Sequence, residues 1–185
     1  MSDPLTAYRT LLAKLDAFFD NALARYPEDI RCGPGCSDCC HRDLSLFPFE
    51  LERLVKAARG LPTAARRRVA ERARLAQSDE EAACPLLEDD RCLVYEARSV
   101  ICRTHGLPSM FQVRPGQREL SLCPYNFKAV ERVDGECVLD LDPVNQALAT
   151  INHLICGQRG ISPERQRISQ ALLAALDGAD GGGGT

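Results

Sequence analysis

Cysteine is the residue type whose number and spacing could do chemistry in this chain of 185 residues, which contains 10 of them. Eight fall into two groups of four. The first group has the spacing C-x3-C-x2-C-C, and the second is spread over residues 84–123. Their members are Cys32, Cys36, Cys39 and Cys40, followed by Cys84, Cys92, Cys102 and Cys123. Structural zinc and cubane iron–sulfur clusters both take four thiolate ligands. The count therefore predicts two four-thiolate sites for zinc or iron, the latter either as ions or as an iron–sulfur cluster.

The adjacent residues Cys39 and Cys40 leave the pairing of ligands to metals open. A C-x2-C spacing, as between Cys36 and Cys39, lets two thiolates bend onto one metal ion. Neighbouring side chains diverge, so Cys39 and Cys40 can serve different metals, and a bridged polynuclear site is equally compatible with the spacing. Cys84 and Cys123 are each followed by proline, which fixes the direction in which the chain leaves the cysteine.

The two remaining cysteines and the histidines are weaker candidates. Cys137 and Cys156 are predicted to be small buried hydrophobic residues rather than ligands. His41 and His105 each lie close to a cysteine, as an additional ligand or as a donor to a metal-bound sulfur, although an ordinary solvated or core position is favoured. His153 is predicted to be structural.

Polar residues surround the second cysteine group. Arg98 and Arg103 could donate hydrogen bonds to sulfur and offset the charge of thiolates, with Tyr95 and Glu96 completing the cluster. An ordinary set of salt bridges between Glu96 and these arginines is the alternative, and both stay open.

A run of arginines over residues 66–74 is a candidate for binding phosphate. The acidic residues that follow favour a solvated helix face instead. Since the chain carries a formal net charge of -3, no nucleic-acid partner is expected.

The local sequence around the cysteines carries a resemblance. The stretches that carry it are Cys36-Ser37-Asp38-Cys39-Cys40 with Cys32 upstream, then Cys84-Pro85-Leu86-Leu87, Cys92-Leu93-Val94-Tyr95-Glu96-Ala97-Arg98, Cys102-Arg103 and Cys123. In this order they resemble the YkgJ-type cysteine-cluster family, which is named for a CxxCxxCC motif, over residues 32–127. The chain departs from the family pattern in its first gap of three residues, in Ser37 where glycine is usual, and in Ser99 where proline is usual.

The resemblance implies chelation of zinc or iron by the eight cysteines, in a structural or regulatory role. The alternative is an iron–sulfur protein that transfers electrons or modifies a partner protein, because flagellin lysine methylases carry a related cluster. No catalytic constellation is recognised: nothing singles out one nucleophile among ten thiols, so enzymatic activity is left undecided, with a non-enzyme favoured.

The compartment follows from what the sequence lacks. It has no apolar run long enough for a membrane helix, and charged residues interrupt any signal-peptide core near the N-terminus. We therefore expect a cytoplasmic protein with reduced thiols, no membrane partner, metal ions as ligands and an unidentified protein partner at most. A disulfide-stapled exported protein is the competing hypothesis.

The elements that must position the cysteines are mostly helices. Helices are predicted from Pro4 to the residues before Pro27, from Pro48 to Gly60, over residues 63–77, in a short piece stopped by Gly106, from Pro143 to about Cys156, and from Pro163 onward. Asp134-Gly135 predicts a β-hairpin over residues 130–141. The fold class is therefore mainly α, with at most this small hairpin. We expect one domain over residues 1–177, built around a cysteine-rich irregular core at 32–127, and a flexible glycine-rich tail at 178–185.

Overall fold

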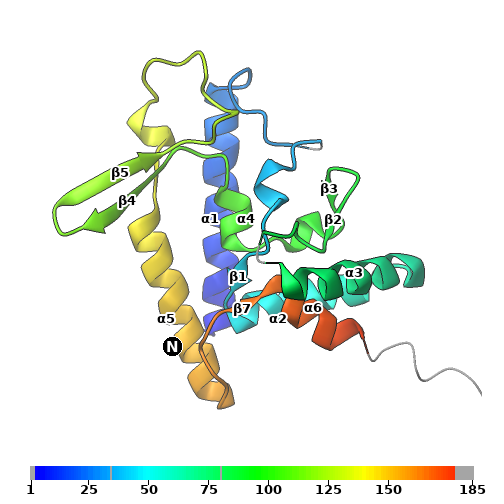
Figure 1. The fold of residues 1–185 in the computed structure, drawn as a ribbon. Helices are drawn as coiled ribbons and strands as arrows, with labels where there is room; N and C mark the ends of the chain where they lie inside the picture. The colour runs from blue at the N-terminus through cyan, green and yellow to red at the C-terminus, as the bar shows by residue number, and fades with distance from the viewer. Residues whose placement is uncertain (1–2, 34, 80, 178–185) are drawn as a thin grey trace, which may run out of the picture. The chain divides into compact units, whose positions relative to one another are not determined.

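The computed structural model describes residues 3–33, 35–79 and 81–177 (Figure 1). These residues are mainly helical, as predicted, but their several short strands exceed the single small hairpin expected. The chain forms two compact units: the first comprises Met1–Gly33 and Val100–Gly160, and the second comprises Pro34–Ser99 and Ile161–Thr185. One domain over residues 1–177 stays a prediction, and the predicted tail lies outside the described residues.

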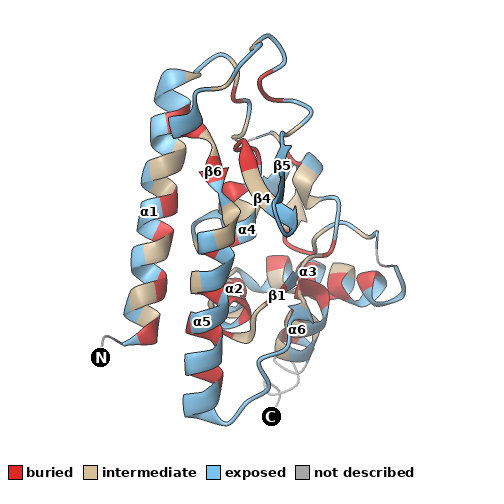
Figure 2. Ribbon diagram, turned by 90° about the vertical axis from the view of Figure 1, so that its left-hand side faces the viewer, coloured by how far each residue is buried: buried red, intermediate tan, exposed pale blue. Residues whose placement is uncertain are grey.

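In the first unit, α1 (Pro4–Arg25) packs against α4 (Val100–Thr104) and α5 (Leu141–Arg159). Helix α1 begins as predicted: the Asp3 carboxylate accepts the Leu5 N–H, and proline fills the first turn. The buried residues of α1 lie along one side of the helix (Figure 2), and they are Pro4, Tyr8, Leu12, Leu15 and Ala22.

Helix α5 starts and ends at different residues from those predicted. Its N-cap is Asp140, whose side chain accepts the Asp142 N–H. The helix runs to Arg159, three residues beyond the predicted end near Cys156, and its C-cap Gly160 takes the left-handed conformation that favours glycine.

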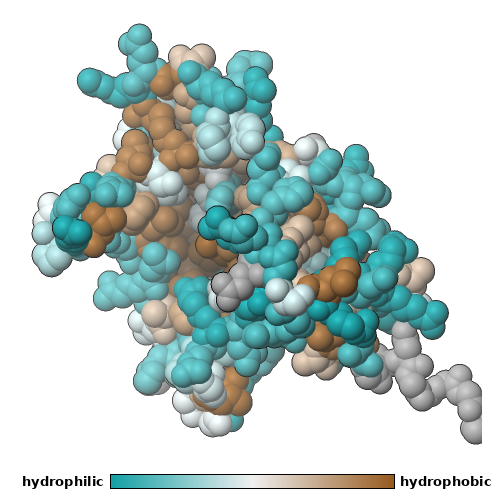
Figure 3. Space-filling view, viewed as in Figure 1, coloured by the Kyte–Doolittle hydropathy of each residue, from teal (hydrophilic) through white to brown (hydrophobic). Residues whose placement is uncertain are grey.

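The sheet of the first unit has the order β5-β4-β6, with β4 (Ser109–Arg114), β5 (Gln117–Ser121) and β6 (Leu139–Asp140). Strands β4 and β5 are antiparallel, whereas β4 and β6 are parallel. The β4–β5 hairpin turns at Pro115 and Gly116, where Gly116 has φ +79°. Its surface mixes hydrophobic and polar side chains, including the exposed Val113 and Leu120 (Figure 3).

The hairpin predicted over residues 130–141 is wrong. Gly135–Cys137 forms a 3-10 turn instead, because the Asp134 carboxylate caps it by accepting the Glu136 N–H. Arg25 of α1 also pairs with Asp134, which fixes the segment against the helix.

In the second unit, α2 (Pro48–Arg59), α3 (Thr63–Leu75) and α6 (Ile168–Leu176) enclose an aliphatic core. The start predicted for α6 at Pro163 is wrong, because residues 166–167 form β7 (Gln166–Arg167), antiparallel to β1 (Ser45–Leu46). The core residues include Leu46, Leu51, Leu54, Val69, Ala73, Leu86, Ile168 and Leu172.

A buried ion pair fixes the segment that follows the first cysteine group. Arg167 Nε donates to Asp43 Oδ2 at 2.9 Å, and the Ser169 N–H donates to Asp43 Oδ1 at 3.1 Å. Arg167 Nη2 also donates to the Ala76 carbonyl at 2.6 Å. The side chain of Asp43 is 0% exposed, so its charge depends entirely on these partners.

A tight strand pair carries one of the candidate ligands, Cys92. Strands β2 (Leu87–Glu88) and β3 (Arg91–Cys92) are antiparallel, and the turn between them uses Asp89 and Asp90 at φ 49° and 57°. This is the left-handed backbone that a two-residue hairpin turn requires.

In the part of the chain that the structure describes, no helix is long and apolar enough to cross a membrane.

Candidate metal centre

The eight candidate ligands are divided between the two units. The first unit holds Cys32, Cys102 and Cys123, and the second holds Cys36, Cys39, Cys40, Cys84 and Cys92. All eight are partly buried, and the ten cysteines, every one of them within the described residues, form no disulfide. The sequence thus suggests two groups of four cysteines, whereas the two structural units hold three and five.

Cys39 and Cys40 lie side by side on a 3-10 turn, Asp38–Cys40. A hydrogen bond with the Cys40 side chain lowers the pKa of the Cys39 thiol to about 6, against an opposing effect of burial. The Arg98 guanidinium also lowers this pKa through its charge. Since the thiolate is the form that binds metal, Cys39 is prepared for ligation near neutral pH.

Cys84 and Cys92 approach this turn from the β2–β3 segment. The Cys84 N–H donates to the Cys40 carbonyl at 2.7 Å. Burial raises the pKa of the Cys92 thiol, and the negative charge of Cys39 raises it further, whereas the Val94 N–H and Arg98 oppose this. Because the charge of Cys39 acts on Cys92, the two thiols lie within electrostatic reach of each other.

A second contact joins these two segments. Ser37 Oγ donates to Asp90 Oδ1 at 2.6 Å, which links the first cysteine group to the turn between β2 and β3. His41 Nε2 lies 3.4 Å from the same Ser37 hydroxyl. Ser37 is buried, so solvent does not compete strongly for this hydrogen bond.

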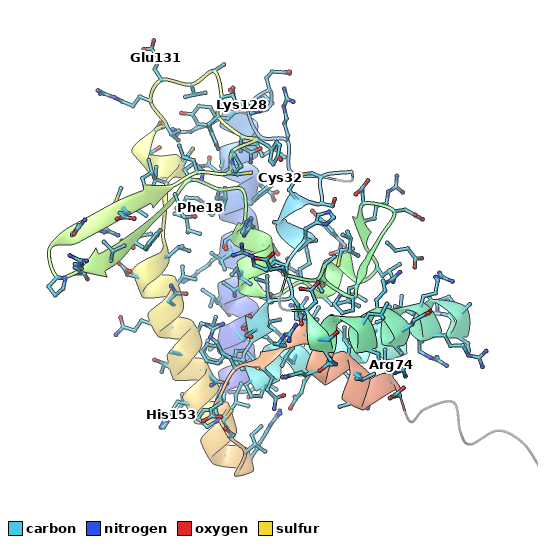
Figure 4. The ribbon with its side chains drawn as sticks, viewed as in Figure 1. Phe18, Cys32, Arg74, Lys128, Glu131 and His153 are labelled. Atoms are coloured by element: carbon cyan, nitrogen blue, oxygen red, sulfur yellow. The ribbon has the colours of Figure 1, made fainter. Side chains whose placement is uncertain are left out.

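In the first unit, the sulfur of Cys32, a residue labelled in Figure 4, contacts a buried amide. Asn126 Nδ2 donates to Cys32 Sγ at 3.2 Å, and the sulfur lies 3.9 Å from the His105 carbonyl oxygen. Sequence analysis did not single out Asn126, and no local pattern points to it, since it lies 94 positions from Cys32.

The predicted neighbours of the second cysteine group separate into the two units. Arg98 is the charged group near both Cys39 and Cys92, and its guanidinium carbon lies 3.5 Å from the centroid of the Tyr95 ring. The Glu96 carbonyl accepts a hydrogen bond from Arg53 Nη2 at 2.7 Å.

The other two predicted neighbours lie in the first unit. Arg103 Nη1 contacts both carboxylate oxygens of Asp16 on α1, at 2.6 and 2.7 Å. His105 is exposed, and its carbonyl oxygen is near the Cys32 sulfur.

Cys137 and Cys156 are buried, as predicted for hydrophobic residues. Burial raises the pKa of the Cys137 thiol, which favours the neutral form. The Cys156 thiol donates to Asn152 Oδ1 at 3.4 Å within α5.

Within residues 3–33, 35–79 and 81–177, no group of three or more Cys, His, Asp or Glu side chains is gathered closely enough to hold a metal ion. The chemistry of the donors nevertheless fits zinc or iron, because thiolates are the ligands that zinc and iron–sulfur clusters select. The lowered pKa of Cys39 and the nearby Arg98 fit a centre that concentrates negative charge.

Partly buried thiols on short turns, with a guanidinium and amide donors beside them, are typical of cysteine-rich metal-binding proteins. The family model CxxCxxCC, described as a putative zinc- or iron-chelating domain, matches residues 31–124, and the chain belongs to this family. The matched residues include all eight candidate ligands. The comparison with curated proteins and the comparison with solved structures gave no match.

Proposed function

We propose that this protein chelates zinc or iron through the thiolates of its eight motif cysteines, and that the metal has a structural or regulatory role. The observation that carries the proposal is that Cys39, Cys40, Cys84 and Cys92 all lie in the second unit and are linked pair by pair. Hydrogen bonding joins Cys39 to Cys40 and Cys40 to Cys84, and the charge of Cys39 acts on Cys92. Membership of a zinc- or iron-chelating family supports the same conclusion.

The residues around these thiols would prepare them for metal. A cysteine ligand must lose its proton, and the Cys40 side chain and Arg98 favour the thiolate of Cys39. Arg98 offsets part of the charge that several thiolates bring together. A bound zinc or iron ion would cross-link the first cysteine group to residues 84–92, which hydrogen bonds already join. The binding energy of the metal would then contribute to the folding energy.

An all-thiolate donor set also suits an iron–sulfur cluster, which would give the protein a role in electron transfer or in modifying a partner protein. Two four-thiolate sites are the arrangement that the number of ligands favours.

Anaerobic purification followed by metal analysis and visible spectroscopy tests the proposal. A colourless protein with stoichiometric zinc supports the zinc site, whereas a brown protein with broad absorption near ~400 nm supports an iron–sulfur cluster. The double variant Cys39→Ser/Cys40→Ser is expected to lose metal from the second unit.

The matched control is Cys137→Ala/Cys156→Ala, which also removes two thiols but from buried positions outside the motif. This control is expected to keep the full metal content. If the wild-type protein binds neither zinc nor iron with thiols kept reduced, the proposed function is wrong.

A further inference from the structure

The sulfur of Cys32 is held by a side chain that is not a metal ligand. Asn126, which is 4% exposed, uses its whole amide: Nδ2 donates to Cys32 Sγ at 3.2 Å and to the Gly106 carbonyl at 2.8 Å, while Oδ1 accepts the Arg31 N–H at 2.9 Å. With three hydrogen bonds in fixed directions, the amide has one orientation, so its contact with the sulfur is built in.

Gly106 makes room for this sulfur. The residue has φ +99°, and a Cβ added to it would lie 2.2 Å from Cys32 Sγ and 3.2 Å from Asn126 Nδ2. The distance to the sulfur is far shorter than any van der Waals contact, and the distance to the amide nitrogen is tight. The close approach of sulfur, amide and backbone therefore requires the absence of a side chain at residue 106.

The backbone on both sides of Asn126 is fixed as well. The Asn126 N–H donates to the Cys123 carbonyl at 3.1 Å, and the Phe127 N–H donates to the Asp29 carbonyl at 2.9 Å. Phe127 has φ 55°, and its ring packs edge-on against Tyr26 with centroids 5.3 Å apart. Asn126 thus connects the sulfur of one candidate ligand, Cys32, with the backbone of another, Cys123.

We infer that Asn126 is a positioning residue for Cys32, which orients the sulfur for metal binding and donates an N–H to it. This inference rests on the proposed function. The donated hydrogen bond strengthens when the sulfur is a thiolate, because a charged acceptor binds an N–H more strongly than a neutral one. Hydrogen bonds of this kind to the ligands of a metal typically change its affinity by ~10- to 100-fold.

A double-mutant cycle on the full-length protein tests the inference, with zinc affinity measured by competition against a chromophoric chelator. Asn126→Asp keeps an oxygen acceptor for the Arg31 N–H but removes the donor to sulfur, and Asn126→Ala removes the amide without adding charge. Each substitution is made both in the wild-type chain and in Cys32→Ser. Asn152→Asp is the matched control, since Asn152 is equally buried in the same unit and bonds to the non-motif Cys156.

We expect either Asn126 substitution to weaken zinc binding by ~10-fold or more in the wild-type chain and by less than ~2-fold in the Cys32→Ser background. Asn152→Asp is expected to lower the melting temperature without weakening zinc binding. Equal losses in both backgrounds would show that Asn126 acts only on folding, and overturn the inference.

The remaining outcomes separate the inference from the proposed function. If Cys32→Ser binds zinc as tightly as wild type, Cys32 is not a ligand and the inference is wrong, while chelation by the other cysteines stands. If the wild-type protein binds no zinc or iron, the proposed function fails, and the inference fails with it.

Discussion

Each unit anchors a cysteine-bearing segment with an arginine–aspartate pair, and the two pairs differ in burial. In the second unit, Asp43 follows Cys40 by three residues and pairs with Arg167, with its side chain 0% exposed. In the first unit, Arg103 follows Cys102 directly and pairs with Asp16, which is 48% exposed.

The two ion pairs have the same residue types but are expected to contribute unequally to stability. A carboxylate fully removed from water has no substitute for its partners, so breaking its pair is costly. In the pair of the first unit the carboxylate is half exposed and already well solvated, while the Arg103 side chain is 9% exposed, so this pair is expected to contribute less than the fully buried Asp43. The second unit therefore depends on a buried charge to place its cysteines, whereas the first unit relies more on neutral contacts such as those of Asn126.

Removal of metal is expected to have the largest effect on stability, and to affect the two units unequally. If binding energy is folding energy, a chelator should lower the free energy of unfolding by several kcal/mol, a substantial part of the roughly 10 kcal/mol or more found for structural zinc in small domains. Hydrogen exchange is expected to lose protection over residues 36–92, where ligands lie on short turns and strands, before it does so in α1 and α5, which pack through apolar faces. Identical protection with and without metal would contradict a structural role.

Asp43→Ala is expected to have the next largest effect. It leaves Arg167 and the Ser169 N–H without their carboxylate, which should cost about 3 kcal/mol or more in the free energy of unfolding. Urea denaturation of the metal-free protein measures this cost without the contribution of the metal. A loss below about 1 kcal/mol would mean that the buried pair is not an anchor.

Asp16→Ala tests the ion pair of the first unit, between Asp16 and Arg103. Asp16 is 48% exposed, but the Arg103 side chain that it pairs with is 9% exposed, so we expect a loss in the same urea experiment that is measurable and smaller than that of Asp43→Ala. A cost equal to that of Asp43→Ala would show that burial does not separate the two pairs.

Glu88→Gln is expected to have the smallest effect, and one that depends on pH. Hydrogen bonds from Arg68 and Arg72 lower the pKa of Glu88 to about 2 from an ordinary value near 4.5. The folded state therefore favours the ionised carboxylate, and this contribution is fully present above pH 4.5 and is lost as the pH falls toward 2. The urea midpoints of wild type and variant should differ at pH 6, and this difference should disappear on acidification. A difference that stays constant with pH would show that the ionised Glu88 carboxylate is not its cause.

Much of the helical fold could be predicted from the sequence because the signals are local. Asp3 with Pro4, and Pro48 with Gly60, mark helix ends through contacts within one turn, and both helices form where expected. The hairpin prediction failed because it used Asp134-Gly135 as an isolated turn signal. In the structure, Asp134 pairs with Arg25, which lies far from it in the sequence. The start of the last helix failed for the same reason, since strand β7 depends on pairing with β1.

In the candidate site, too, local features could be predicted from the sequence and long-range contacts could not. The eight cysteines and Arg98 are visible as a motif, because their spacing and local sequence are the signal. Asn126 is not, since its link to Cys32 exists only after residues far apart in the sequence come together. The same is true of the hydrogen bond between Ser37 and Asp90, although both residues lie close to motif cysteines.

The missing side chain at Gly106 also determines which sequence changes this protein tolerates. A methyl group there would lie 2.2 Å from the Cys32 sulfur, so even alanine, the mildest replacement, would force that sulfur to move. In a saturation mutational scan, residue 106 would then show the same intolerance profile as residue 32, although it carries no chemistry of its own.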